Sequence, residues 1–169
     1  MAIDTSKYVD RVRRLGMENS LTLDPGDIEG TLDLALQALA DKVAASDAPW
    51  RLQKTYTIAI TSGLTADLNS GNPDLMTGAL FRVSHPDAPT TFVPNLSDLD
   101  RPSNQMFYKW TIAENKIQMR KGDGLTAPAN GNLTVSACYV PTISTVPYIL
   151  EDNLVEEGYR LARTNAPTQ

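Results

Sequence analysis

The spacing of the apolar residues changes near residue 50, and this change most limits how the chain can fold. Before it, apolar residues recur at steps of three and four, as on one face of a helix: Ile28, Leu32, Leu36, Leu39 and Val43. After it, they alternate with polar residues, as in a half-buried strand: Leu52, Tyr56, Ile58 and Ile60. The pattern predicts the α+β class, in which helices and strands occupy separate segments.

An N-terminal helix is expected near residues 4–16. Asp4 or Thr5 can cap its start, and Gly16 is expected to end it. Three cations are expected in its last turns, where the helix dipole favours positive charge: Arg11, Arg13 and Arg14. They form either an exposed face that satisfies the dipole or a contact for an acidic partner.

A second, stronger helix is expected over residues 27–46, with Pro49 as its end. Leu34 lies off the apolar stripe of this helix, which predicts that the helix buries more than one face.

The last helix is expected to begin near Pro147. Glu151 and Asp152 fall in its early turns, and Arg160 and Arg163 fall near its end, which is the order that the helix dipole favours. Glu156 and Arg160 are four residues apart and can pair.

Gly158 lies on the same face of this last helix as Leu150, Leu154 and Leu161. Glycine within a helix costs about 1 kcal/mol relative to alanine, so we expect another group to approach the backbone closely there.

The middle of the chain predicts four to six short antiparallel strands, forming a sheet or a sandwich-like pair of sheets. In one strand, Ala79, Phe81 and Val83 are expected to share a face, and residues 113–115 are a plausible hairpin turn. Ser97 is expected to cap a single helical turn. We therefore expect one structural unit with three segments: helical residues 1–48, β-rich residues 49–141, and a C-terminal helix and tail at 142–169.

Composition excludes several classes of function. A net charge of −5 argues against binding to a nucleic-acid backbone, which requires clustered lysine and arginine. The single cysteine excludes an internal disulfide framework and a zinc site of paired cysteines. The charged N-terminal segment is unlike a signal peptide, and no apolar run reaches the roughly 18 residues of a membrane helix. We expect a protein that neither enters nor crosses a membrane by itself.

No pattern of catalytic or metal-binding residues is recognisable, so we expect no enzyme, no cofactor and no metal. His85 is expected to be a loop residue, and Cys138 a small apolar residue of a strand. Asp98 and Asp100 are expected to provide a helix cap and a local ion pair with Arg101.

Large aromatic residues gather in one strand, with Tyr108 and Trp110 on the same face and Phe107 on the other. Packing against a core is the favoured interpretation, and contact with a partner, including a glycan, is the alternative. Trp50 is expected to cover the core.

Three stretches give the chain a family resemblance: GDIEGTLDLALQALADKVAASDAPWRLQKTYTIAITSG, LSDLDRPSNQMFYKWTIAENKI and NLTVSACYVPTISTVPYILEDNLVEEGYRLA. Their order of two helices, a β-rich excursion and a terminal helix resembles the head–tail adaptor, or connector, proteins of tailed bacteriophages. The resemblance is one of order and style, without a diagnostic motif.

The resemblance implies a structural virion protein at the neck, assembled in the host cytoplasm. It implies a ring of twelve copies beneath the portal protein, which extends the channel through which DNA passes and presents a surface to the next neck or tail protein. Candidate contacts with the portal or with neighbouring subunits are then Leu154, Val155, Gly158, Tyr159, Leu161 and Arg163. The tail NAPTQ is a segment that could become ordered on binding.

Three alternatives stay open. The first is another virion assembly protein, with a role in tail completion, the baseplate or capsid decoration. A carbohydrate-binding module would use an exposed face of Tyr108 and Trp110. An enzyme is the last alternative.

Overall fold

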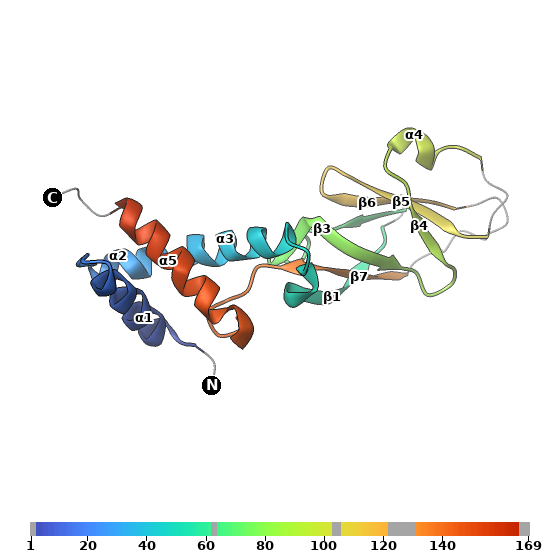
Figure 1. Cartoon of the computed structure of the whole chain (residues 1–169). Helices are drawn as coiled ribbons and strands as arrows, with labels where there is room; N and C mark the ends of the chain where they lie inside the picture. Colours follow the sequence, from blue (N-terminus) through green and yellow to red (C-terminus); the bar gives the residue numbers. More distant parts are fainter. Residues whose placement is uncertain (1–2, 62–63, 103–105, 122–130, 166–169) are drawn as a thin grey trace. The chain divides into compact units, whose positions relative to one another are not determined.

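The chain forms two compact units in the computed structural model, which describes residues 3–61, 64–102, 106–121 and 131–165 (Figure 1). One unit comprises residues 1–52 and 139–169 and is helical; the other comprises residues 53–138 and contains the sheets. The described residues include five α-helices and two sheets, so the predicted α+β class is confirmed. The predicted tail lies mostly outside the described residues, since residues 166–169 are not among them.

The helical unit is built around its last helix. Its elements are α1 (Thr5–Glu18), α2 (Pro25–Gly30), α3 (Leu32–Ala44), α5 (Glu151–Asn165) and the short 3-10 helices η1 (Pro49–Leu52) and η2 (Tyr148–Leu150). Helix α5 contacts α1, α2 and α3 (Figure 1). Apolar side chains from all four helices form the core between them: Tyr8, Val12, Ile28, Leu36, Leu39, Leu154 and Ala162.

Helix α1 begins as predicted but ends later. The Asp4 carboxylate caps it by accepting a hydrogen bond from the backbone N–H of Lys7 at 2.8 Å. The prediction that Gly16 ends the helix is wrong, because α1 continues to Glu18. A Cβ on Gly16 would lie 3.1 Å from Cδ1 of Leu23, so this glycine serves close packing of the following loop. The last turn of α1 contains no basic residue, and Arg11, Arg13 and Arg14 lie in the turns before it.

The predicted second helix is interrupted at Thr31, which separates α2 from α3. The Thr31 hydroxyl donates a hydrogen bond to the carbonyl of Ile28 at 2.8 Å, so the side chain competes locally with helical bonding. Leu34 is 59% exposed, which contradicts the expectation that this helix buries a second face. Helix α3 ends at Ala44, five residues before Pro49.

The sheet unit has seven described strands in two sheets, more than the four to six expected. One sheet has the order β1-β7-β3, formed by β1 (Gln53–Ala59), β7 (Asn132–Tyr139) and β3 (Leu75–Ser84). The other has the order β2-β6-β5-β4, formed by β2 (Thr65–Asp67), β6 (Lys116–Lys121), β5 (Tyr108–Ala113) and β4 (Thr90–Phe92). Strands β4 and β5 are parallel, whereas the sequence predicted only antiparallel pairs. The unit also contains the short helix α4 (Leu96–Leu99).

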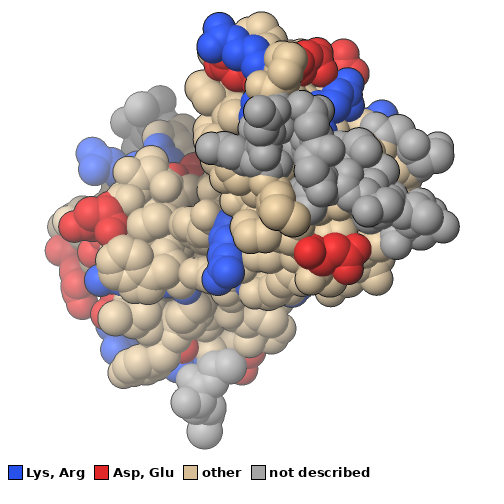
Figure 2. All heavy atoms as spheres, turned by 90° about the vertical axis from the view of Figure 1, so that its right-hand side faces the viewer, with Lys and Arg blue, Asp and Glu red and all other residues tan. Residues whose placement is uncertain are grey.

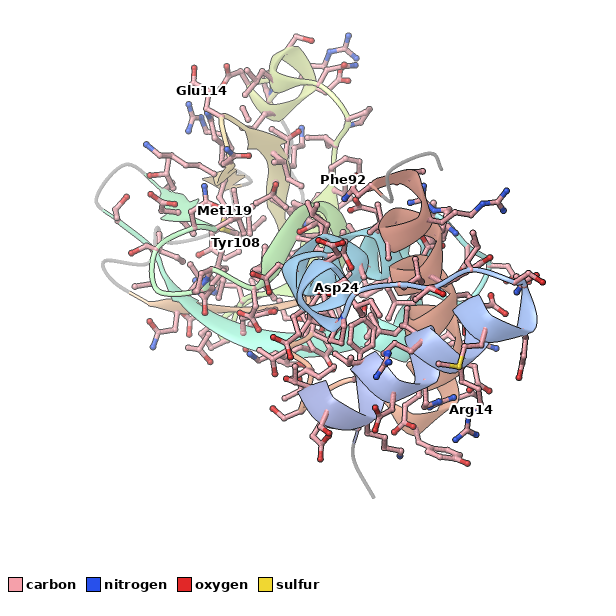
Figure 3. All side chains as sticks on the ribbon, turned by 90° about the vertical axis from the view of Figure 1, so that its left-hand side faces the viewer. Arg14, Asp24, Phe92, Tyr108, Glu114 and Met119 are labelled. Carbon is pink, nitrogen blue, oxygen red and sulfur yellow. The ribbon has the colours of Figure 1, made fainter. Side chains whose placement is uncertain are left out.

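Each sheet has one apolar, buried face. In the first, Tyr56 pairs with Val135 and Ile58 with Leu133 across β1 and β7, and all four side chains are buried. In the second, Trp110 pairs with Met119 across β5 and β6, and Tyr108 lies on the same face (Figure 3). The alternation predicted for Tyr56, Ile58 and Ile60 is confirmed, because all three are buried.

Two large aromatic residues are exposed. Phe81 is 39% exposed on β3, an edge strand of its sheet, whereas Val83, which was predicted to share its face, is buried. The prediction for Trp50 is wrong. Trp50 is 63% exposed in η1 and does not cover the core.

The predicted hairpin turn is confirmed. Ala113 and Lys116 are paired across β5 and β6, which leaves Glu114 and Asn115 as the two turn residues (Figure 3 labels Glu114). Their φ angles are 54° and 59°, and a two-residue turn with positive φ at both positions matches the right-handed twist of its strands. Ser97, by contrast, does not cap α4, whose N-cap is Asn95.

Within the described residues, none of the helices combines the length and the apolar character that crossing a bilayer requires.

Candidate partner-binding surface

The contact residues implied by the resemblance all lie on α5, but they differ in accessibility. Leu154, Val155 and Gly158 are buried within the helical unit. Tyr159 and Leu161 are half-buried, and Arg163 is exposed. Only the last three therefore present surface to a partner.

Gly158 is closely approached by a group of the same chain. A Cβ at this position would lie 2.7 Å from Cζ of Tyr8 and closer still to the Tyr8 hydroxyl. Tyr8 comes from α1 and is fully buried, and this burial raises the pKa of its hydroxyl, an effect that the Thr31 side chain only partly opposes. The glycine thus lets α1 pack against the backbone of α5, which explains its place on the packing face.

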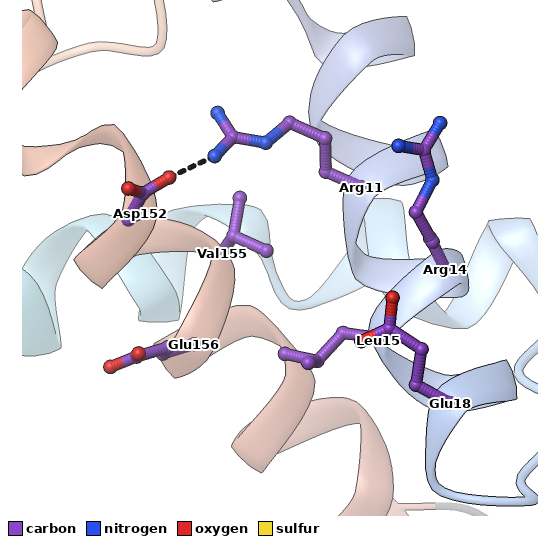
Figure 4. A pocket seen from close by; sticks show the side chains of 7 residues that line it. All are labelled: Arg11, Arg14, Leu15, Glu18, Asp152, Val155 and Glu156. Atoms are coloured by element: carbon purple, nitrogen blue, oxygen red, sulfur yellow. Dashed lines mark hydrogen bonds and ion pairs between the residues drawn. The ribbon is translucent and has the colours of Figure 1, made fainter.

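A buried carboxylate joins the start of α5 to α1. The Glu151 side chain is buried, and its Oε2 lies 3.2 Å from Nη1 of Arg11 and 3.6 Å from Nζ of Lys7. Arg11 also pairs with the exposed carboxylate of Asp152, as Figure 4 shows. The acids that the sequence placed in the first turn therefore also fix α1 beside α5.

A second buried carboxylate joins the middle of α5 to α3. Glu157 pairs with Lys42 of α3, and its Oε2 accepts a hydrogen bond from Nε of Arg160 at 3.0 Å. The predicted pair of Glu156 with Arg160 is wrong, because Arg160 binds the neighbouring, inward-facing Glu157. Glu156 is four residues and Glu157 three residues before Arg160. Both spacings bring side chains together on a helix, so spacing alone cannot tell which carboxylate the arginine binds.

A groove runs between α1 and α5, with a volume of about 340 Å³ (Figure 4). Arg11, Arg14 and Glu18 line it from α1, and Asp152 and Glu156 line it from α5. Leu15 and Val155 supply its apolar lining. A second groove of about 190 Å³ lies between α3 and α5, and Glu156 borders this groove as well. The outward face of α5 is therefore a ridge between two hollows.

Two exposed apolar residues precede α5. Tyr148 is 81% exposed and Ile149 is 64% exposed, and both line a hollow of about 280 Å³ with Arg11, Glu151 and Asp152. Aromatic side chains beside charged groups are common in protein interfaces. This pair was not predicted; the available signal was that Ile149 lies off the face of Leu150 and Leu154.

His85 and Cys138 both lie in packed surroundings. The His85 side chain is buried, accepts a hydrogen bond from the backbone N–H of Asp87 at Nδ1, and lies 4.6 Å from the Tyr108 ring, centroid to centroid. Cys138 is buried, and burial raises the pKa of its thiol, which opposes formation of a nucleophilic thiolate. The predicted ion pair of Asp98 and Arg101 is present at 3.3 Å. The described part of the chain contains no cluster of three or more metal-ligating side chains.

The aromatic strand is packed rather than exposed. Tyr108 is 1% exposed and Trp110 is 7% exposed, which confirms the interpretation that they pack against the core. The exposed aromatic face that a carbohydrate-binding module would use is therefore not formed by this pair.

Charged groups do not gather into one large patch on the face drawn in Figure 2. Among its coloured atoms, blue and red groups are scattered and separated by uncharged side chains. A nucleic-acid site would instead require clustered cations.

Comparison with models of known protein families gave no match, and comparison with curated protein sequences gave none either.

Proposed function

We propose that this chain is a structural virion protein, a head–tail adaptor that forms a ring of twelve copies beneath the portal of a tailed bacteriophage. In this role it extends the DNA channel and presents a surface to the next neck or tail protein. It works by binding proteins and carries out no reaction.

The observation that carries this proposal is the way in which the two ends of the chain form one helical unit. Helix α5 packs between α1 and α3, although about a hundred residues of sequence separate it from them, and the sheet unit is an excursion between these helices. This arrangement supports the resemblance in element order, in which two N-terminal helices, a β-rich excursion and a terminal helix follow one another.

The residues of α5 that keep accessible surface supply the proposed portal contact. Of the residues implied by the resemblance, Tyr159, Leu161 and Arg163 retain accessible surface. The others contribute to the core of the helical unit and support the contact without reaching a partner.

The decisive experiment is light scattering of purified portal rings, of this protein alone, and of the mixture. The proposal expects the portal complex to gain the mass of twelve copies of this chain. Absence of any gain, with the protein shown to be folded by circular dichroism, would overturn the portal role and favour a different virion assembly function.

A surface variant tests the contact better than a truncation. Removing α5 would expose the core, because Leu154 and Ala162 are buried. Leu161→Asp is the better choice, since its side chain is only half-buried, and we expect it to reduce the mass gain. Leu34→Asp is the matched control, because it makes the same change at an exposed position of α3.

A further inference from the structure

One exposed face of α5 has acidic residues at its start and a basic residue at its end, so it is complementary in charge to a second copy that runs in the opposite direction. Asp152, Glu156, Tyr159 and Arg163 follow one another at steps of four, three and four, which places them on one face of the helix. Asp152, Glu156 and Arg163 are exposed, and Tyr159 is half-buried. The first half of this outward stripe is acidic, and its second half, with the exposed Arg160 beside it, is basic.

We propose that two copies of this chain associate through the outward stripe, with their α5 helices antiparallel. In this arrangement Asp152 lies opposite Arg163 of the partner subunit, and Glu156 lies opposite Arg160 of the partner subunit. A twofold axis repeats each contact, so two complementary pairs become four.

The charges of the stripe remain available for this contact. Glu156 and Arg163 have no ion-pair partner among the described residues. Arg160 pairs with Glu157, yet its side chain is 56% exposed and can meet a second carboxylate. Asp152 pairs with Arg11, yet its side chain is 84% exposed and can accept a second cation. Antiparallel helices also place the positive N-terminal end of each helix dipole beside the negative C-terminal end of the other, which favours this orientation.

The apolar residues before α5 extend the contact at both ends. Helix α5 has 15 residues, a length of about 22 Å, so the last turn of the partner's helix lies beside the first turn of this one. Tyr148 and Ile149 are exposed there, and the Tyr148 ring can cover the guanidinium of Arg163 of the partner subunit. Each copy thus contributes an aromatic and aliphatic anchor beside its charge pairs.

The dimer contact shares Tyr159 and Arg163 with the proposed portal contact, so one copy makes one contact or the other at a time. A twofold contact closes on two copies and cannot propagate around a ring, so it belongs to the free protein. Dimerisation and mass gain on the portal are separate measurements, and failure of one leaves the other standing.

Sedimentation equilibrium of the full chain, across protein concentration at low and high salt, tests the proposal. We expect a species of twice the 18.4 kDa chain mass that dissociates more readily as salt rises. A protein that is monomeric throughout the concentration series at low salt would overturn it.

Charge reversal identifies the surface. We expect Asp152→Arg and Arg163→Glu each to weaken dimerisation at least tenfold, because each reversal places like charges opposite one another twice. Mixing the two variants should restore the dimer, since both pairs are then complementary. Formation of complexes larger than a dimer in this mixture would indicate a head-to-tail contact and overturn the twofold arrangement.

Asp33→Arg is the matched control, because Asp33 is an exposed acid in the first turn of α3. It should leave dimerisation unchanged. Ile149→Asp probes the apolar anchor without altering the stripe and should also weaken the dimer. A dimer unaffected by Arg163→Glu and by Ile149→Asp would overturn the proposed surface.

Discussion

Different interactions stabilise the interior of each of the two units. In the helical unit, buried carboxylates of α5 bind cations from other helices: Glu151 with Lys7 and Arg11, and Glu157 with Lys42. In the sheet unit, the ion pair of Lys54 and Asp74 is partly exposed, and the apolar inner faces of the strands supply the packing. Backbone pairing aligns strands, whereas helices have no such ladder between them, so side-chain charge can fix how the helices of one unit meet.

The largest effects are expected from core truncations, which test whether the units unfold separately. Leu154→Ala in α5 and Leu133→Ala in β7 each remove a fully buried side chain and should each cost about 2–5 kcal/mol. The chain's two tryptophans are divided between the units, with Trp50 in the helical unit and Trp110 in the sheet unit.

Denaturant unfolding of the Trp50→Phe and Trp110→Phe backgrounds therefore reports each unit by fluorescence. We expect Leu154→Ala to shift the Trp50 signal and Leu133→Ala to shift the Trp110 signal. Equal shifts of both signals by either variant would show that the units unfold as one.

Neutralising a buried carboxylate should show more clearly that the two units are stabilised by different interactions. Glu157→Gln keeps the shape of the side chain but removes the charge that Lys42 and Arg160 share, and we expect a loss of about 1.5–3 kcal/mol. Asp74→Asn is the control in the sheet unit, where an exposed pair is worth about 0–1 kcal/mol. Equal losses in thermal unfolding would contradict the proposed difference between the units.

The packing of α1 against α5 depends on Gly158. We expect Gly158→Ala to destabilise the helical unit by about 1–3 kcal/mol, because the new methyl group would overlap the buried Tyr8 ring. Adding Tyr8→Phe removes the nearest atom and should recover part of the loss, which a double-mutant cycle measures. Gly30→Ala, with no atom within 4 Å of its new Cβ, should cause no such loss.

The smallest effect is expected at the hairpin turn of the sheet unit. Replacing Glu114–Asn115 by Asn–Gly supplies residues that tolerate positive φ and should stabilise that unit by about 0.5–1 kcal/mol. The Trp110 signal should move to higher denaturant while the Trp50 signal stays in place. A destabilisation would show that the turn geometry is wrong.

Local patterns predicted the parts of the fold that depend on local chemistry. The stripe from Ile28 to Val43 located the helical segment, alternation located β1 and β7, and two turn residues located the hairpin. The short strands β2 and β4 were not predicted, because three residues are too few to show a period. The parallel pairing of β4 with β5 was not predicted either, because it depends on residues far apart in the sequence.

The candidate surface was predicted only in part, for the same physical reason. Helical spacing placed Gly158 on the packing face, but only the fold shows that Tyr8 is the group that approaches it. Spacing also could not choose between Glu156 and Glu157 for Arg160, because burial and Lys42 decide that choice. For Tyr148 and Ile149 the only signal in the pattern was that Ile149 lies off the face of Leu150 and Leu154, which does not predict how exposed the pair is.

The register of β1 and β7 has a consequence for the modularity of the chain. Gln53 and Cys138, the first and last residues of the sheet unit, are cross-strand partners, so their Cα atoms lie within about 4.5–5.5 Å of each other. A gap of that size can be closed by a short artificial turn joining Leu52 to Tyr139. Residues 53–138 could thus be removed or replaced by another domain while the two segments of the helical unit stay covalently joined.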